Sequence, residues 1–209
     1  KLIDKLILKV NALADVGVKV DIYTSLESTG SQAEYARDGL DYWKWLVNTQ
    51  RMLKETKSTI AIMTTVNILS LPTFIDFIMT VMDLRKAYNT SFEWNRIPLS
   101  VNIMHWPPHL QCTLLDVDYR TTIANTIEKV CEQWLKYYTK EKYARLYLEE
   151  FDQIKRLCDY LRNTESATEH RADFVRYIHA YDKRRDKDFA ETFPQYITHL
   201  EEWNGEKTK

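Results

Sequence analysis

Segments with helical spacing of apolar residues alternate with short strand-like segments, and this order limits the folds open to the chain. The helical segments are 2–13, 41–57 and 70–88, and the strand-like segments are 19–27, 59–67 and 99–106. Only 4 glycines and 5 prolines occur among 209 residues, so few positions interrupt these segments. Strands separated by helices of this length pair in parallel through right-handed crossovers. The first half of the chain therefore predicts an α/β fold with a parallel sheet.

The pattern changes after residue 117. Helical spacing continues through 119–138, 141–162 and 172–183, with short polar turns between these segments. We therefore expect two parts, an α/β part over residues 1–117 and an all-helical C-terminal extension over residues 118–209.

The composition argues against two classes of partner. The formal net charge is −1 and charged residues make up 28% of the chain, so there is no excess of positive charge for binding nucleic acid. The longest apolar stretches, such as 59–66, are far shorter than the roughly 20 residues of a membrane-spanning helix. With no secretion signal at its start, the chain is expected to be cytoplasmic, with neither a nucleic acid nor a membrane as partner.

The three cysteines are odd in number and far apart in the sequence. Cys112, Cys131 and Cys158 match neither a disulfide framework nor the spacing of a metal knuckle, so we expect ordinary buried thiols. No metal ligand and no catalytic residue is assigned within the chain.

Polar side chains share one face of each predicted strand. That face carries Asp21, Tyr23, Ser25 and Glu27 in the first strand, Ala61, Met63, Thr65 and Asn67 in the second, and Ser100, Asn102, Met104 and Trp106 in the third. Ser25, Glu27, Thr65 and Asn67 stand at the carboxyl ends of strands, where parallel sheets bind ligands. Since a closed barrel fills its interior with apolar side chains, a polar face predicts an open or partial barrel with a ligand in its lumen. The alternative is the solvent-exposed face of a two-layer α/β domain.

Three segments together resemble radical S-adenosylmethionine (SAM) proteins. Residues 22–39, IYTSLESTGSQAEYARDG, resemble the fourth-strand region of that family, in which a strand end of the form SxD/E precedes an R-x-G helix entry. Residues 64–67, TTVN, follow at a spacing similar to that of the family's fifth strand. Residues 181–194, YDKRRDKDFAETFP, resemble the closing segment of members with a twitch-type C-terminal extension.

The resemblance implies the C-terminal half of a partial (β/α)6, TIM-like barrel with parallel strands. The parent enzyme would bind a [4Fe–4S] cluster and SAM, and would cleave SAM reductively to a 5′-deoxyadenosyl radical that abstracts hydrogen from an unknown substrate. The family's CxxxCxxC and Gly-Gly-Glu motifs, expected ahead of the fourth strand, do not occur. The chain is therefore expected to be a fragment that is inactive alone.

The resemblance also implies a set of SAM-binding residues. Ser25 and Glu27 would lie near the SAM carboxylate or ribose, and Arg37 near the carboxylate. Asn67 would lie near the ribose or the methionyl part, with Thr65 beside it. Hydroxyl, amide and guanidinium groups suit these hydrogen-bonding partners.

Simpler roles stay open for three of these residues. Arg37 can pair with Glu34 or Asp38 on a surface turn, Glu27 can cap the turn that follows it, and Asn67 can end its strand. For the whole chain, the competing hypothesis is a catalytically silent α/β-plus-helix module that binds a protein or peptide partner through its helical tail.

Overall fold

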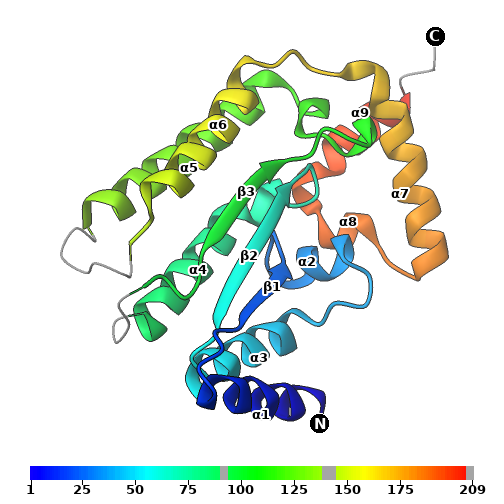
Figure 1. Cartoon of the computed structure of the whole chain (residues 1–209). Coiled ribbons are helices and arrows are strands. Elements are labelled where there is room, and N and C mark those ends of the chain that lie inside the picture. Colours follow the sequence, from blue (N-terminus) through cyan, green and yellow to red (C-terminus); the bar gives the residue numbers. More distant parts are fainter. Residues whose placement is uncertain (90–93, 138–144, 206–209) are drawn as a thin grey trace.

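A three-stranded parallel sheet organises the part of the chain that the computed structural model describes, residues 1–89, 94–137 and 145–205 (Figure 1). The strands are β1 (Asp21–Ser25), β2 (Thr59–Val66) and β3 (Leu99–Ile103), in the order β1-β2-β3. The helices are α1 (Leu2–Asp15), α2 (Gly30–Ala36), α3 (Tyr42–Glu55), α4 (Phe74–Tyr88), α5 (Val117–Tyr137), α6 (Leu148–Asn163), α7 (Arg171–Arg185), α8 (Phe189–Thr192) and α9 (Ile197–Gly205). The predicted α/β class with a parallel sheet is confirmed.

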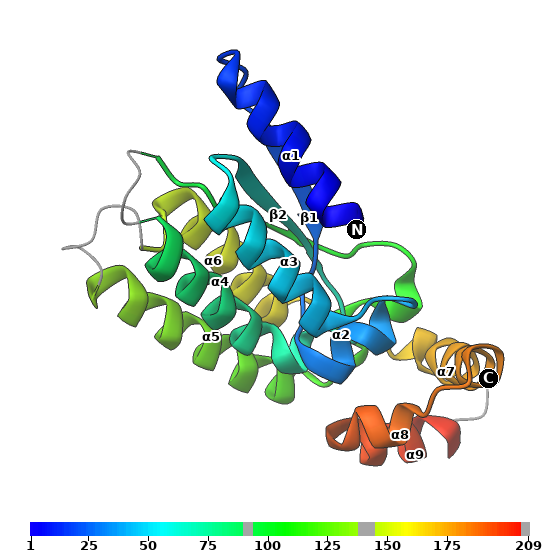
Figure 2. The same cartoon turned by 90° about the horizontal axis from the view of Figure 1, so that it is seen from below.

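The crossover helices lie on one face of the sheet. Helix α3 connects β1 to β2, and α4 connects β2 to β3, so both connections move across the sheet in the same direction. Right-handed crossovers of this kind place their helices on the same side, as Figure 2 shows. Burial agrees, because Ile60, Ile62 and Val66 of β2 are buried, whereas the intervening Met63 and Thr65 are not. Among the described residues, no helix covers the opposite face (Figure 1).

Helix α6 closes the outer edge of β3. Glu150 Oε1 accepts the main-chain N–H of Leu99 at 2.9 Å, and Gln153 Oε1 accepts that of Val101 at 2.6 Å. An edge strand has main-chain groups that a neighbouring strand would otherwise bind. Side chains of α6 replace that strand here.

A buried ion pair joins α4 to α6 and to the start of β3. The Arg85 side chain is fully buried, and its Nη1 and Nη2 donate to the Glu150 carboxylate at 2.7 and 2.5 Å. Nε and Nη2 of Arg85 also donate to the Ile97 carbonyl, at 2.9 and 2.6 Å. Because the same Glu150 carboxylate binds both the Arg85 guanidinium and the β3 backbone, this buried ion pair fixes the position of α6 along the strand.

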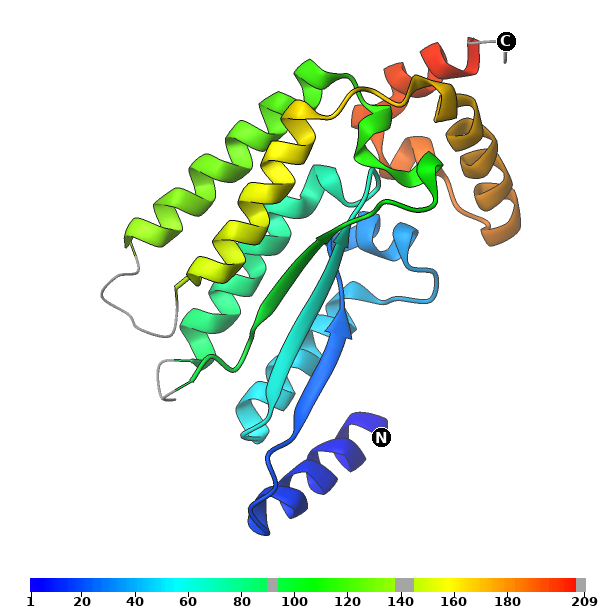
Figure 3. The same cartoon turned by 45° about the horizontal axis from the view of Figure 1, so that its top comes forward.

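The C-terminal helices pack on α2 and on the turn after β2. Tyr35 of α2 donates a 2.6 Å hydrogen bond to Asp182 of α7, and the Tyr196 hydroxyl donates to the Ile68 carbonyl at 3.0 Å. Phe189 and Phe193 stack on one another and contact Tyr35 edge-on. The last helices therefore lie beside the carboxyl ends of β1 and β2 (Figure 3).

Three details differ from the sequence prediction. Helix α2 was not expected, because its seven residues are too few to show a clear period. Strand β3 ends at Ile103 rather than residue 106, and Trp106 ahead of Pro107 is 80% exposed. Helix α6 begins at Leu148 rather than residue 141, where the Glu150 carboxylate caps the helix by accepting the Tyr147 N–H at 3.1 Å. Residues 141–144 lie outside the described part of the chain.

No helix in the described ranges is both long enough and apolar enough to cross a membrane.

Candidate functional site

Toward its carboxyl end, the uncovered face of the sheet carries hydroxyl, amide and methionine side chains in register across the strands. Ser25 at the end of β1 stands opposite Met63 of β2, and Met63 stands opposite Ser100 of β3. Toward the carboxyl ends, Thr65 stands opposite Asn102, whose amide donates to the Thr64 carbonyl and the Ser100 hydroxyl, both at 3.3 Å. The face therefore offers hydroxyl and amide groups to a ligand at its carboxyl end.

Glu27 and Arg37 bind one another just beyond this end of β1. Arg37 Nε donates to Glu27 Oε1 at 3.0 Å, and Arg37 Nη2 donates to Glu27 Oε2 at 2.6 Å. The Glu27 residue is only 4% exposed, and α2 carries the chain around so that Arg37 returns to it. This two-pronged pair is a strong geometry for guanidinium and carboxylate. Glu27 is consequently committed to Arg37.

Asn67 closes the turn that follows β2. Its Oδ1 accepts the N–H groups of Leu69 at 2.9 Å and Ser70 at 3.2 Å, and its Nδ2 donates to the Thr65 carbonyl at 3.1 Å. Its own N–H donates to the Ser70 hydroxyl at 2.9 Å. These are the contacts of an Asx turn, so the simpler role considered for Asn67 describes its geometry.

The five predicted residues therefore divide into two groups. Ser25 and Thr65 lie on the uncovered face of adjacent strands, with Ser25 exposed and Thr65 partly so. Glu27, Arg37 and Asn67 bind other parts of the chain. Asn67 does not share the uncovered face as expected, since it is buried in a turn.

The partners considered for Arg37 are engaged elsewhere. The Glu34 carboxylate accepts the N–H of Tyr42 at 2.8 Å, and the Asp38 carboxylate pairs with Arg185 at 2.6 Å. Glu27 was missed as the partner because α2, which brings Arg37 back to it, was not predicted.

Two further residues belong to this region of the sheet. Asn102 is exposed on the same face as Thr65, and the alternation of β3 in the sequence already placed it there. Ser28 follows Glu27 and is 1% exposed, and its hydroxyl has no hydrogen-bond partner within the described residues. No sequence signal distinguishes a buried serine of this kind from an exposed one.

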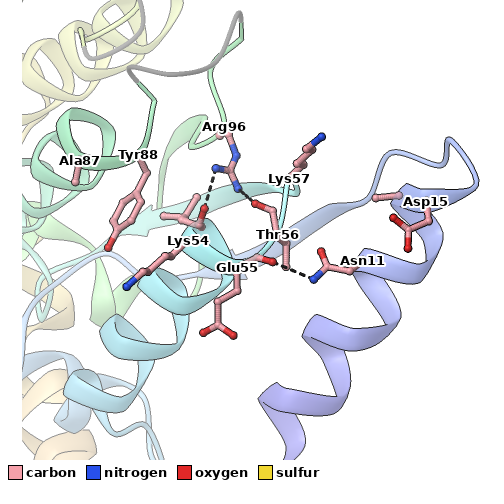
Figure 4. Close-up of a pocket in the computed structure, with 11 residues that line it drawn as sticks. Asn11, Asp15, Lys54, Glu55, Thr56, Lys57, Ala87, Tyr88 and Arg96 are labelled. Carbon is pink, nitrogen blue, oxygen red and sulfur yellow. Dashed lines mark hydrogen bonds between the residues drawn. The ribbon is translucent and has the colours of Figure 1, made fainter.

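A hollow with a volume of about 550 Å³ lies at the opposite end of the sheet, between α1 and the ends of α3 and α4 (Figure 4). Arg96 projects toward it, but the guanidinium donates to the carbonyls of Leu53, Thr56 and Ser58 at 2.8 to 3.0 Å. Burial lowers the Arg96 pKa to about 10. The Arg96 guanidinium therefore binds the carbonyl groups at the end of α3, and we do not assign it to a ligand.

The cysteines are isolated thiols. Burial raises the pKa of Cys112, Cys131 and Cys158 to about 12 in each case, so all three stay protonated at neutral pH. Within the described residues, no group of three histidine, cysteine, aspartate or glutamate side chains converges on a point. These residues do not fit an iron–sulfur cluster.

The chain matches no protein-family model, no curated protein and no solved structure.

Proposed function

We propose that the chain is the C-terminal part of a radical SAM enzyme, in which the uncovered sheet face forms one wall of the SAM site. The observation that carries this proposal is the sequential strand order with both crossovers on one face and Ser25 and Thr65 on the other. Doubly wound sheets are covered by helices on both faces, whereas the strands of a barrel keep one face inward. The three strands are accordingly proposed as part of a partial (β/α)6, TIM-like barrel.

The residues take different roles in this proposal. The hydroxyls of Ser25 and Thr65 hydrogen-bond the ribose or carboxylate of SAM. Arg37 donates to Glu27 through Nε and Nη2, and its Nη1 is proposed to donate to the SAM carboxylate. Asn67 acts as a positioning residue, since its side chain fixes the turn next to Thr65.

The cluster chemistry belongs to residues outside this chain. When bound, the cluster would supply the electron for reductive cleavage of SAM. The described residues do not fit the cluster, so no step is assigned to them beyond binding and orienting SAM. The resemblance of residues 22–39 and 181–194 supports the assignment of the parent activity.

Anaerobic reconstitution of the intact protein with iron, sulfide and reductant tests the proposal. We expect SAM binding by equilibrium dialysis and release of 5′-deoxyadenosine. Ser25→Ala should weaken SAM binding several-fold, whereas Ser100→Ala, on the same face but two strands away from Ser25, should leave it unchanged. A protein that neither binds SAM nor releases 5′-deoxyadenosine refutes the proposal, and the silent protein-binding module then becomes the better hypothesis.

A further inference from the structure

The two edges of the sheet differ in how their backbone groups are satisfied. At β3, Glu150 and Gln153 occupy the outward N–H groups of Leu99 and Val101. Helix α6 thus stands where another strand would be. The sheet is closed on this side.

The β1 edge has no such cover among the described residues. The Val20 carbonyl accepts the N–H of Thr59, and the N–H of Leu26 donates to the Met63 carbonyl. In a parallel ladder, alternate residues face the same neighbour, so even-numbered residues of β1 face β2. The backbone groups of Asp21, Tyr23 and Ser25 therefore point away from β2, and no other described element binds them. A β1 edge of this kind is a template for strand pairing.

Helix α1 has an apolar stripe that is only half covered. Ile7 and Val10 are buried, whereas Leu2, Leu6 and Leu13 are 85%, 40% and 43% exposed. At 100° per residue, these three leucines lie within one narrow strip beside Val10. Within residues 1–89, 94–137 and 145–205, this leucine strip is therefore left largely uncovered.

The position of α1 continues the helix layer past β1. Asp4 of α1 pairs with Arg51 of α3 at 2.9 Å, and Asn11 donates to the Glu55 carbonyl at 3.0 Å, so α1 and α3 are neighbours. Helices α3 and α4 each connect two adjacent strands, and α1 leads into β1 in the same way. A helix at that place in the layer belongs to the connection between β1 and a strand on its outer side. Figure 3 shows α1 beside the amino end of β1, at the open edge of the sheet.

We propose that the β1 edge and the Leu2–Leu6–Leu13 strip together receive one further strand, parallel to β1, from a polypeptide segment that directly precedes α1 in the intact protein. The strand would bind the outward backbone groups of Asp21, Tyr23 and Ser25 and would place apolar side chains under the strip. This inference does not depend on SAM binding, since any parallel α/β sheet would be extended in the same way.

A second copy of the chain fits this edge less well. Lys5 and Lys9 border the leucine strip on the side away from Val10. In a two-fold antiparallel contact between two copies of α1, equivalent flanks of the two helices face one another. The lysines of one copy would therefore lie opposite the lysines of the other. A two-fold contact between β1 edges would also be antiparallel, whereas the other pairings of the sheet are parallel.

Residue-resolved hydrogen exchange on the 209-residue chain and on the polypeptide that its gene encodes tests the proposal. In the 209-residue chain, the amides of Asp21, Tyr23 and Ser25 should exchange at least tenfold faster than those of Ile22 and Thr24. In the intact protein without SAM, these three amides should slow at least tenfold. The amides of Leu99 and Val101 serve as the internal control, because side chains of α6 bind them in both proteins.

Substitutions separate docking from folding. Tyr23→Pro removes only an outward N–H and is tolerated at a free edge, whereas the control Thr24→Pro breaks the ladder to β2. In the intact protein, Leu6→Lys should increase exchange at the β1 edge, whereas Leu8→Lys, at a site 70% exposed on another side of α1, should not.

Three outcomes would overturn the proposal. The first is a gene product no longer than these 209 residues, and the second is unchanged fast exchange at the three amides in the intact protein. The third is protection that appears only with a doubled mass in light scattering, because a second copy would then be the occupant. The first outcome would also refute the proposed function, whereas the second and third would overturn this inference alone, because SAM binding is measured separately.

Discussion

Glu150→Ala tests whether the buried Arg85–Glu150 ion pair, which joins α4, β3 and α6, stabilises the fold. The substitution leaves the fully buried Arg85 guanidinium without its carboxylate and removes the acceptor of the Leu99 N–H. Removing one partner of a buried ion pair costs about 3–5 kcal/mol, and the two losses share one carboxylate and do not add. We expect the free energy of unfolding to fall by about 4 kcal/mol, which is a large part of the roughly 5–15 kcal/mol of a typical domain.

Urea unfolding followed by circular dichroism measures this change, with an unchanged slope showing that the folded state keeps its compactness. Glu149→Ala, at the exposed neighbouring position, is the matched control and should stay within about 0.5 kcal/mol of the natural chain. Glu150→Gln keeps an acceptor oxygen but loses the charge, and it should lie between the two. A loss below about 1 kcal/mol for Glu150→Ala would refute the reasoning, because the buried guanidinium would then need no counter-charge.

Asn67→Ala should cost about 1–3 kcal/mol in urea unfolding because the turn loses its acceptor, while Asn67→Asp should recover most of the loss; equal effects would contradict the Asx turn. Tyr196→Phe should cost about 1 kcal/mol, since the buried Ile68 carbonyl loses its donor, and a neutral result would mean that water replaces it. The three buried thiols should resist a thiol reagent at pH 8 in the folded chain and react in urea. Burial lowers the pKa of His109 below the value of about 6.5 that it has in the unfolded chain. Between these two pKa values, the unfolded chain binds more protons than the folded chain. Stability should therefore fall as the pH drops through this window, and it should fall less in His109→Gln.

The periodic elements were predictable because each has enough residues to repeat its pattern. The expected strand segments contain β1, β2 and β3, and α3 spans Tyr42–Glu55 within the expected 41–57. Helix α2 was not predicted, because its seven residues, beginning at Gly30, are too few to show a helical repeat of apolar positions. The Glu27–Arg37 pair was missed for the same reason, since α2 brings Arg37 back to Glu27.

The candidate site was predictable only to the level of the strand face. Alternation placed Ser25 and Thr65 on the uncovered side, and both are there. Alternation cannot tell where a side chain just past a strand end will point, because the backbone no longer alternates there. Glu27 and Asn67 stand at such positions, and both turn inward to bind the protein itself.

The way Arg96 binds the end of α3 has a consequence for the order in which the chain becomes structured. Its three carbonyl partners lie 38 to 43 residues earlier in the sequence. On the ribosome, α3 emerges well before Arg96, so its last carbonyls face water and the final turn frays. That turn becomes fixed only when the segment entering β3 docks and closes the intervening loop. The end of α3 and the start of β3 thus belong to one cooperative unit, and the amide of Thr56 should open to exchange together with those of β3.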